Sequence, residues 1–334
     1  MPGPDPEQPS RAYPRLCAPS LRDRVLASLA VGERSEWMVD APVHIRRIVS
    51  DRGFTRLRPA GGGVEFQVFA AESSDGAVVV LRTPVQGRFQ FDPNDGHVDT
   101  RSLLRWEYAV TRHLGQLGFP VATPYELCLG EADVLVSEFL PDDGRGADQV
   151  ALGALLRQLH QAPLPPMAPV AAHGLPPAQL LAQRMAERLA ALVRYGVNVP
   201  PGPPVEQVIE VLAARPAGRL LHLDVRASNL RSADGHILGV LDWSNALVGD
   251  PAMELGRLAE YALVDGNGVD YEQVLAGYGE GLDLDSPAFW IYRLDTAVML
   301  ALLFSSNAAD TGLGPAAIDR LQVVHERVRR ALAD

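Results

Sequence analysis

The stretch that decides the fold is LLHLDVRASNL, residues 220–230, which is followed by GVLDWSNALVGDPAMEL, residues 239–255. Asp224 and Asn229 are five residues apart in it, and Asp242 comes thirteen residues after Asn229. These polar side chains stand on predicted loops at the ends of apolar strands. Each one alone would be a turn or cap former, because Asp and Asn favour such places. As an ordered set, they are interpreted as a binding site.

The three side chains match the needs of a phosphoryl-transfer site, which positions a nucleophile, clamps a triphosphate and neutralises its charge with Mg²⁺. Mg²⁺ takes oxygen ligands from carboxylates, phosphates and water, so Asn229 and Asp242 are its predicted protein ligands. Asp224 is then the predicted catalytic base beside an acceptor hydroxyl. The spacing H-x-D-x-x-x-x-N of a kinase catalytic loop is satisfied by His222, Asp224 and Asn229. His222 is interpreted as a structural member of this loop rather than as a proton shuttle.

The first half of the chain supplies a second set of candidates. The stretch PAGGGVEF, residues 59–66, is predicted to be a glycine-rich turn between a helix and a strand. Its glycines are Gly61, Gly62 and Gly63, which either cradle phosphates with their backbone N–H groups or serve only the turn. Arg82 ends a strand at the place where a kinase has a phosphate-contacting lysine. Glu107 lies on the next predicted helix, where it can pair with Arg82.

The hydrophobic pattern predicts a β-rich first half. Alternating residues predict a hairpin of strands 64–72 and 77–82 around an SSDG turn. A polar loop, residues 83–100, leads into a helix at 101–118. Two strands follow at 125–130 and 133–140. Short amphipathic helices are predicted before the hairpin, at 20–31 and 43–53.

The second half is predicted to be mainly helical. Helical spacing is clear at 150–160 and 177–196, and helices run from the GDP stretch to the end. Short strands at 218–224 and 236–243 interrupt them, joined through a turn at Asp234 and Gly235. The fold class is therefore α+β and bilobal. Residues 1–42 form an N-terminal extension, 43–143 a small β-rich lobe, and 144–334 a larger helical lobe, with the boundary in FLPDDGRG, residues 139–146.

With these motifs in this order, the chain resembles the aminoglycoside phosphotransferase and choline kinase-like family, which has a protein-kinase-like fold. The resemblance covers about residues 45–310. Within the family, GVEFQVFAAESSDGAVVVLRTP, residues 63–84, and LDWSNALVGDPAMEL, residues 241–255, are most similar to macrolide phosphotransferases. The resemblance implies ATP or GTP as phosphate donor and Mg²⁺ as cofactor. It also implies that the backbone of a hinge reads the purine, and the hinge residues are Glu138, Phe139 and Leu140.

The chain departs from the family pattern in the catalytic loop. The family usually has H-G-D, but here Leu223 replaces the glycine and VRAS, residues 225–228, fills the loop. Arg226 is either a surface charge or a contact to an anionic acceptor or phosphate, and it is grouped with the candidate catalytic residues. The expected function is phosphate transfer to a hydroxyl of a small natural product, macrolide-like or aminoglycoside-like. The alternatives are a kinase acting on Ser or Thr of a precursor peptide, and a catalytically silent pseudokinase that acts as a binding partner.

Charge, cysteine content and hydrophobic patterning limit the classes of partner and the cellular location that we expect for this chain. A formal net charge of −11 argues against nucleic-acid binding, which needs a basic face. Two cysteines, Cys17 and Cys128, cannot form a disulfide framework, and the first residues do not resemble a signal segment, so we expect a cytoplasmic protein. The longest apolar run, residues 295–304, is too short for a membrane span and predicts a buried helix. The helix from about Gly314 offers a possible homodimer surface.

Overall fold

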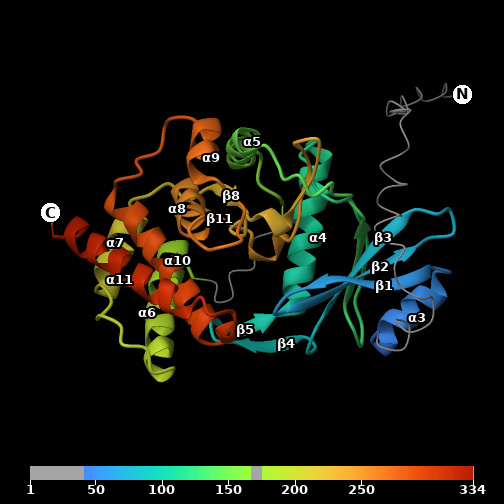
Figure 1. The fold of residues 1–334 in the computed structure, drawn as a ribbon, viewed down its shortest axis with the longest axis horizontal. Coiled ribbons are helices and arrows are strands. Elements are labelled where there is room, and N and C mark those ends of the chain that lie inside the picture. Colours follow the sequence, from blue (N-terminus) through green and yellow to red (C-terminus); the bar gives the residue numbers. More distant parts are fainter. Residues whose placement is uncertain (1–40, 167–174, 334) are drawn as a thin grey trace, which may run out of the picture. The chain divides into compact units, whose positions relative to one another are not determined.

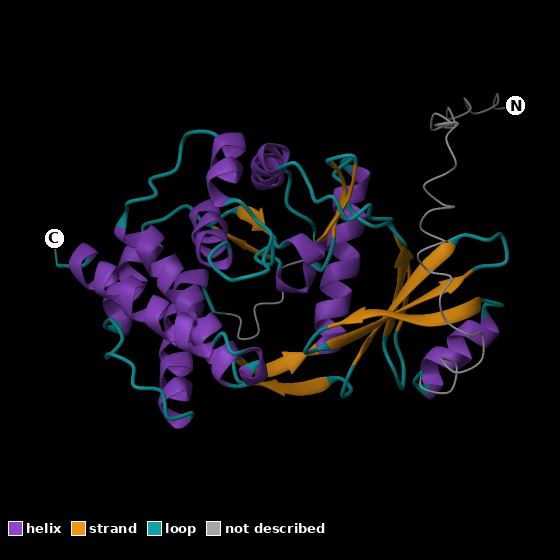
Figure 2. Cartoon of the chain, in the orientation of Figure 1, coloured by secondary structure: helices purple, strands orange, loops and turns teal. Residues whose placement is uncertain are grey.

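The computed structural model describes residues 41–166 and 175–333 (Figures 1 and 2). The helix predicted at 20–31 lies outside the described residues. The second predicted helix is present as α3, Val43–Asp51, and the chain turns away after it at Gly53, whose φ is +64°.

A five-stranded antiparallel sheet forms the β-rich lobe. Its order is β1-β2-β3-β7-β6, with β1 Thr55–Gly62, β2 Phe66–Glu72, β3 Val78–Pro84, β7 Val134–Glu138 and β6 Pro124–Cys128. The predicted hairpin is confirmed, since β2 and β3 pair from Phe66–Pro84 to Glu72–Val78. The glycine-rich turn, however, joins strands β1 and β2 rather than a helix and a strand. Its predicted setting was wrong because β1 has mostly exposed side chains and no apolar alternation.

Helices cover both faces of this sheet. On one face, α3 packs Ile45 and Val49 against Leu81 and Val136. On the other face lies α4, Thr100–Gln116, which was predicted at 101–118 and whose Leu104 packs against Phe66 and Leu135. The next turns of α4 belong to the large core of the helical lobe, through Trp106, Val110 and Leu114. One helix therefore joins the two cores.

The polar segment before α4 was predicted as a loop but contains a second hairpin. Its strands are β4, Phe89–Asp92, and β5, Asp95–Asp99. Tertiary contacts hold this hairpin: Asn307 donates to Asp92, and Arg188 donates to the carbonyl of Asn94. Both aromatic side chains of β4 are exposed, which is why apolar patterning missed it.

The helical lobe has the predicted character. Its helices are α5 Gln149–Gln161, α6 Pro177–Arg194, α7 Val205–Ala213, α8 Pro251–Tyr261, α9 Tyr271–Tyr278, α10 Pro287–Ser305 and α11 Gly314–Ala331 (Figure 1). Within the described residues, α10 alone is long and apolar enough to cross a membrane, but 78% of its apolar window is buried. It packs against α6, α8 and α11, which confirms a buried core helix.

Two short two-stranded antiparallel sheets position the motif loops inside the helical lobe. Strand β8, Arg219–Leu221, pairs with β11, Leu247–Gly249, and β9, Leu230–Ala233, pairs with β10, His236–Val240. The turn at Asp234 and Gly235 is present, but it joins β9 to β10 and not the two predicted strands to each other. The polar segment LRSA of β9 carries no apolar alternation, so it was not predicted. The predicted catalytic loop thus runs from β8 to β9, and Asp242 lies two residues after the end of β10.

Candidate functional site

Arg82 is the centre of the polar site. Its Nη1 donates to Glu107 Oε1 over 3.1 Å and its Nη2 to Asp242 Oδ1 over 2.7 Å. Its guanidinium also lies over the ring of Phe66, with 4.3 Å from Cζ to the ring centroid. The side chain is only 12% exposed. The predicted pair of Arg82 and Glu107 is therefore present, and the same cation also holds the predicted metal ligand Asp242.

The charges of this cluster shift one another. Burial alone would lower the pKa of Arg82, but the carboxylates of Asp242 and Glu107 raise it above its ordinary value. Burial raises the pKa of the Glu107 carboxyl to about 7, Arg82 opposes the rise, and the negative Asp242 adds to it. Burial also acts against the charge of Asp242, yet Arg82 and Ser244 hold the pKa of its carboxyl at about 2. One guanidinium cannot fully compensate two buried carboxylates, so the pKa of Glu107 rises while that of Asp242 stays low.

Asp224 is fixed by two neighbours in the catalytic loop. Asn229 donates from Nδ2 to Asp224 Oδ2 over 2.8 Å and to its carbonyl over 2.9 Å. Arg226 brings Nη2 to 3.3 Å from the same Oδ2. The structure therefore places the predicted amide ligand, Asn229, and Arg226 beside the carboxylate of the predicted base, Asp224. Asp224 is 6% exposed.

Both ring nitrogens of His222 are used within the loop. Nε2 lies 2.9 Å from the carbonyl of Leu241, and Nδ1 accepts from the backbone N–H of Asp224 over 3.1 Å. This arrangement assigns the proton to Nε2, since a carbonyl only accepts. The ring also stands edge-on to Trp243, 4.5 Å between centroids, and both side chains are buried. The geometry supports the structural interpretation of His222.

The donor set fits Mg²⁺ as a partial site. Asp242 uses Oδ1 for Arg82 and for the hydroxyl of Ser244 at 2.7 Å, and Asn229 makes its bonds to Asp224 through nitrogen. Asp242 Oδ2 and Asn229 Oδ1 are the oxygens that would ligate a hard cation. No group of three or more His, Cys, Asp or Glu side chains among the described residues could hold a metal. A cation here would therefore take its other ligands from phosphates and water.

The three candidate glycines end β1 and open the turn to β2. All three are exposed, Gly61 has a φ of +147°, and the N–H of Gly63 donates to the carbonyl of Phe66 over 2.8 Å. Only glycine adopts such a φ readily. Phe66, whose ring lies under the guanidinium of Arg82, is the first residue of β2. The turn therefore leads into β2, which pairs with the strand β3 that carries Arg82.

The predicted hinge connects the two lobes. Glu138 ends β7, and its carboxylate accepts from the backbone N–H and the hydroxyl of Thr123. Leu140 packs against β10 so closely that a Cβ on Gly239 would come within 2.2 Å of its Cδ1. Phe139 between them is half-buried. The proposed division at residue 143 falls in the segment between β7 and α5 and stays a prediction.

The sequence interpretation missed three contributors to the site. Ser244 bonds Asp242, Phe66 stacks on Arg82, and Glu254 of α8 accepts from the backbone N–H groups of the catalytic loop. Ser244 and Glu254 lie in the motif LDWSNALVGDPAMEL, in which only Asp242 was predicted to be a site residue. Asp250 caps α8, because its carboxylate accepts from the N–H of Ala252 at the start of that helix.

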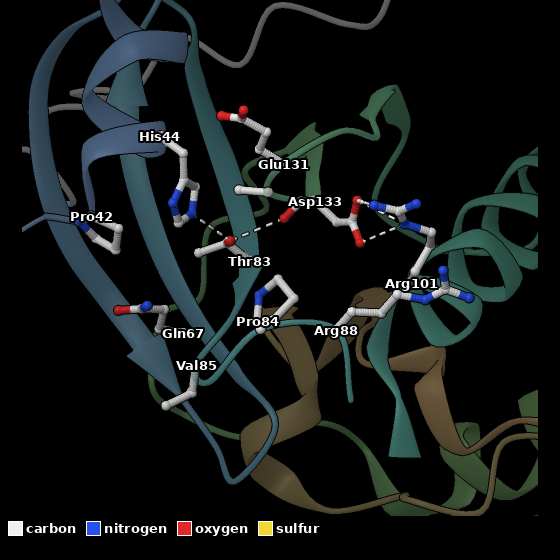
Figure 3. A pocket seen from close by; sticks show the side chains of 12 residues that line it. Pro42, His44, Gln67, Thr83, Pro84, Val85, Arg88, Arg101, Glu131 and Asp133 are labelled. Atoms are coloured by element: carbon white, nitrogen blue, oxygen red, sulfur yellow. Dashed lines mark hydrogen bonds and ion pairs between the residues drawn. The ribbon is translucent and has the colours of Figure 1, made fainter. Parts of the chain in front are cut away.

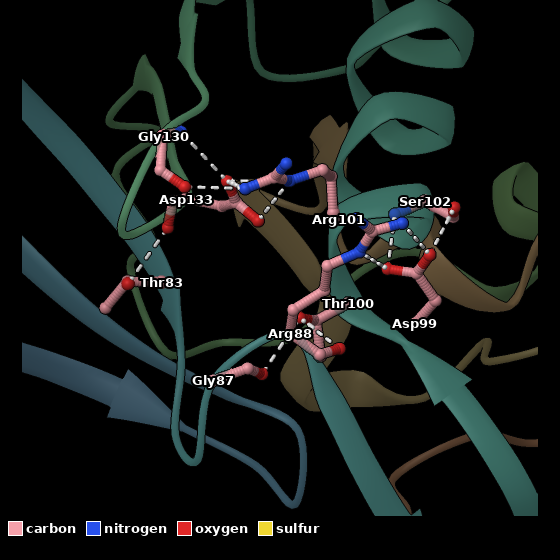
Figure 4. A network of polar contacts seen from close by, with 9 residues as sticks. All are labelled: Thr83, Gly87, Arg88, Asp99, Thr100, Arg101, Ser102, Gly130 and Asp133. Atoms are coloured by element: carbon pink, nitrogen blue, oxygen red, sulfur yellow. Dashed lines mark hydrogen bonds and ion pairs between the residues drawn. The ribbon is translucent and has the colours of Figure 1, made fainter.

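A separate cavity of about 280 Å³ lies beside β3, α3 and the β6–β7 turn (Figure 3). Its lining includes His44, Thr83 and Asp133, and none of the predicted site residues. Ion pairs of Arg101 with Asp133 and of Arg88 with Asp99 border it (Figure 4). Successive side chains of a strand point to opposite faces, so β3 directs Arg82 to the site and Thr83 to this cavity.

Comparison with solved structures identifies the fold. The aminoglycoside phosphotransferase APH(4)-Ia superposes with a TM-score of 0.58 at 15% identity, over 85% of this chain and 98% of that one. A choline/ethanolamine kinase family protein from Mesorhizobium loti gives 0.54 at 18% identity, over 94% and 98%. Macrolide 2'-phosphotransferase MphH from Brachybacterium faecium gives 0.47 at 21% identity, over 83% and 97%.

The sequence comparison identifies the family. No curated protein matches the chain. The profile described as the Phosphotransferase enzyme family does match, over residues 56–290, which is more than half of the chain and contains every predicted site residue. The bilobal fold and the motif order agree with this match. The chain therefore belongs to the aminoglycoside phosphotransferase-type phosphotransferase enzyme family.

Proposed function

We propose that this enzyme transfers the γ-phosphoryl group of ATP or GTP to a hydroxyl of a small natural product. The observation that carries the proposal is the double contact of Arg82, which joins the β-rich lobe to Asp242 beside the Asp224–Asn229 loop. Through these two contacts, Arg82 holds a helix carboxylate and a metal-type carboxylate together. The planar fork of arginine suits two partners better than a lysine would.

Asn229 and Asp242 are the proposed protein ligands for Mg²⁺. When bound, the metal would neutralise charge on the nucleotide phosphates. Arg82 would contact the same phosphates, steadied by Glu107, and the turn of Gly61, Gly62 and Gly63 would cover them. The backbone of residues 138–140 would meet the purine.

Asp224 is the proposed base. Asn229 and Arg226 both approach its Oδ2, so Oδ1 is the oxygen turned to an acceptor. The acceptor oxygen forms a bond to the γ-phosphorus, the bond from that phosphorus to the β–γ bridging oxygen breaks, and the hydroxyl proton passes to Asp224. Arg226, 46% exposed, is placed to meet the negative charge of the transferred group.

The acceptor class is proposed from relatives. One structure of an APH(4)-Ia mutant is described as a ternary complex with AMP-PNP and hygromycin B, a nucleotide analogue and a small antibiotic. A macrolide-like or aminoglycoside-like acceptor is the corresponding proposal here.

The two alternative functions have different requirements. A peptide acceptor would require an extended groove. The pseudokinase alternative would require loss of Mg²⁺–nucleotide binding although both oxygen donors are kept. A cytoplasmic location and a homodimer through α11 remain predictions.

Two measurements test the proposal. The first is thermal melting with Mg²⁺ plus ATP or GTP, for the wild type and Asp242→Asn. A ligand that binds the folded state raises the melting temperature. At a hundredfold excess over Kd it adds about 2.7 kcal/mol to the free energy of unfolding, and the variant should lose most of this shift.

The second measurement is turnover with hygromycin B or a macrolide as acceptor. Asp224→Ala should lower kcat by about 10²- to 10⁴-fold and keep the nucleotide shift. Unchanged turnover in that variant would refute the assignment of Asp224.

A further inference from the structure

We propose that Arg257 is a specificity residue for the acceptor, which binds an oxyanion carried by the acceptor beside Asp224. The inference rests on the proposed function where it names the acceptor, whereas the anion site itself stands on geometry. Arg257 lies on α8 and is 6% exposed. The acceptor class is then a hydroxylated small molecule that also bears a carboxylate or another oxyanion.

One face of α8 follows the predicted catalytic loop. Glu254, in the first turn of α8, accepts from the backbone N–H of Leu223 over 2.7 Å. Arg257 and Tyr261 lie three and seven residues further on, so they share this face of the helix. The two side chains therefore follow the loop past Leu223, toward Asp224.

Two further observations place Arg257 and Tyr261 near Asp224. The segment after α8 contacts the loop, because the carbonyl of Asn267 accepts from the N–H of Ala227 over 2.9 Å. Burial acts against the charge of Arg257, yet Tyr261 and the carboxylate of Asp224 are among the neighbours that raise its pKa. Burial also raises the pKa of the Tyr261 hydroxyl, Arg257 opposes the rise and Asp224 adds to it. Since charge interactions weaken with distance, these groups lie close together.

The guanidinium of Arg257 is buried without a carboxylate partner. Its Nε donates to the hydroxyl of Tyr261 over 3.3 Å, and its Nη2 lies 2.7 Å from the Sδ of Met299 on α10. The hydroxyl stays neutral because its pKa is raised, and a thioether is a weak acceptor. Within the described residues, no carboxylate forms an ion pair with Arg257, and its Nη1 has no hydrogen-bond partner. A bound anion would remove the cost of this buried charge.

The carboxylates that act on Arg257 through space have partners of their own. Asp295 pairs with Arg188 over 2.8 Å, and Oδ2 of Asp224 accepts from Asn229. Neither carboxylate contacts Arg257 directly.

Positive charge and unpaired polar atoms gather around Arg257. Burial lowers the pKa of Arg188 to about 10, the cations Arg184 and Arg257 add to this decrease, and two aspartates oppose it. Arg188 also donates to the carbonyl of Asn94. Among the described residues, Arg184 Nε and Asn94 Oδ1 are buried without a hydrogen-bond partner. An oxyanion that carries hydroxyl groups fits these surroundings.

The oxyanion has two chemical sources, the acceptor itself or the transferred phosphoryl group. The phosphates already have Arg82, Arg226 and the proposed Mg²⁺ ligands beside them. Arg257, by contrast, bonds only to side chains of α8 and α10. The acceptor is therefore the source that the geometry favours.

Thermal melting with sodium sulfate as probe tests the anion site, with sodium chloride at equal ionic strength as reference. Sulfate stabilises folded proteins in general by exclusion, so the readout is the difference between wild type and variant. Arg257→Met should bind sulfate at least tenfold more weakly, because charge-assisted hydrogen bonds are lost. Arg257→Lys keeps the charge and should retain part of the sulfate shift.

The ligand-free proteins give a second readout. Arg257→Met should melt at or above the wild-type temperature, since it replaces an unpaired buried charge by an adaptable apolar side chain. The matched control is Arg293→Met, which removes a partner of Glu260; it should melt lower and keep the sulfate shift. A sulfate shift in Arg257→Met equal to that of the wild type, a lower melting temperature or failure to fold would overturn the inference.

Repeating the sulfate experiment with Mg²⁺ and AMP-PNP separates the two sources. An acceptor oxyanion site should still bind sulfate when the nucleotide site is filled. Loss of the sulfate shift would assign the anion to the phosphoryl position and overturn the acceptor assignment.

Turnover with MgATP tests the acceptor class, using D-glucuronate and its methyl ester, which share their hydroxyls and differ by one negative charge. In the wild type, kcat/KM should be at least tenfold higher for the acid, and in Arg257→Met the two values should agree within about twofold. Equal values in the wild type would contradict an acidic acceptor. Lack of turnover with every acceptor tested would count against the proposed function alone, because the sulfate experiments need no catalysis.

Discussion

Two buried ion clusters in this molecule have opposite stoichiometry. At the site, one cation, Arg82, faces two carboxylates, Glu107 and Asp242. At the junction of α8, α10 and α11, one carboxylate, Glu260, faces two cations, Arg293 and Arg320. All six side chains are at least partly buried. The two clusters therefore differ not in burial but in how many of their charged atoms have a hydrogen-bond partner.

The Glu260 cluster is satisfied and the Arg82 cluster is not. Both oxygens of Glu260 accept guanidinium N–H groups. At the site, by contrast, Arg82 Nε and Glu107 Oε2 are buried without a hydrogen-bond partner. Fully paired buried charges fix structure, whereas an excess of negative charge favours an added cation. This difference agrees with the proposed role of the Arg82 cluster in ligand binding and with a packing role for the Glu260 cluster.

Removing the shared ion of each cluster should give the largest effects. Arg82→Ala leaves two buried carboxylates unpaired and Glu260→Ala leaves two arginines unpaired, so each should lower the free energy of unfolding by about 3–5 kcal/mol. Only Arg82→Ala should also abolish the melting shift with Mg²⁺ and nucleotide. Urea unfolding and melting with ligand measure both. Equal loss of the nucleotide shift in Glu260→Ala would break the comparison.

The excess of one negative charge in the Arg82 cluster should make the free energy of unfolding depend on pH. Folding raises the pKa of Glu107 from 4.5 to about 7, so its stabilising contribution is fully present below about pH 4.5 and is lost as pH rises through 7. The full difference is about 3 kcal/mol. Glu107→Gln removes this titration, so the unfolding free energies of wild type and variant should diverge between pH 5 and 8. Parallel curves would show that Glu107 does not hold the proton.

The smallest effect should come from Ser244→Ala, which removes the hydroxyl donor to Asp242 Oδ1. A hydrogen bond to a charged group contributes about 1.5–3 kcal/mol, and partial exposure of Asp242 places this one at the lower end. We expect a lower melting temperature and a weaker nucleotide shift. A matched Ser306→Ala change, which removes a hydroxyl bond to the carbonyl of Leu302 in α10 and touches no predicted site residue, should leave the nucleotide shift intact.

Much of the fold was predictable because its signals are local. Alternating apolar residues predicted β2 and β3, and helical spacing predicted α4, α5 and α6. Turn residues predicted the connection between β9 and β10, although strand β9 itself was not predicted. The hairpin β4–β5 was missed, since Phe89 and Phe91 point outward and its stability comes from Asn307 and Arg188. Strand β1 was missed for a similar reason, because hydrogen bonds to β2 rather than buried side chains define it.

The sequence by itself determined which groups are available for chemistry and in what order they occur. His222, Asp224 and Asn229 lie within one short loop, so their spacing alone brings them together. Tertiary structure alone decided that Arg82 reaches Asp242, 160 residues away, and that Glu254 meets the turn at Leu223, 31 residues before it. The physical reason is that local spacing sets side-chain direction, whereas the pairing of buried charges and the contacts of the catalytic loop depend on which distant elements the core packs together.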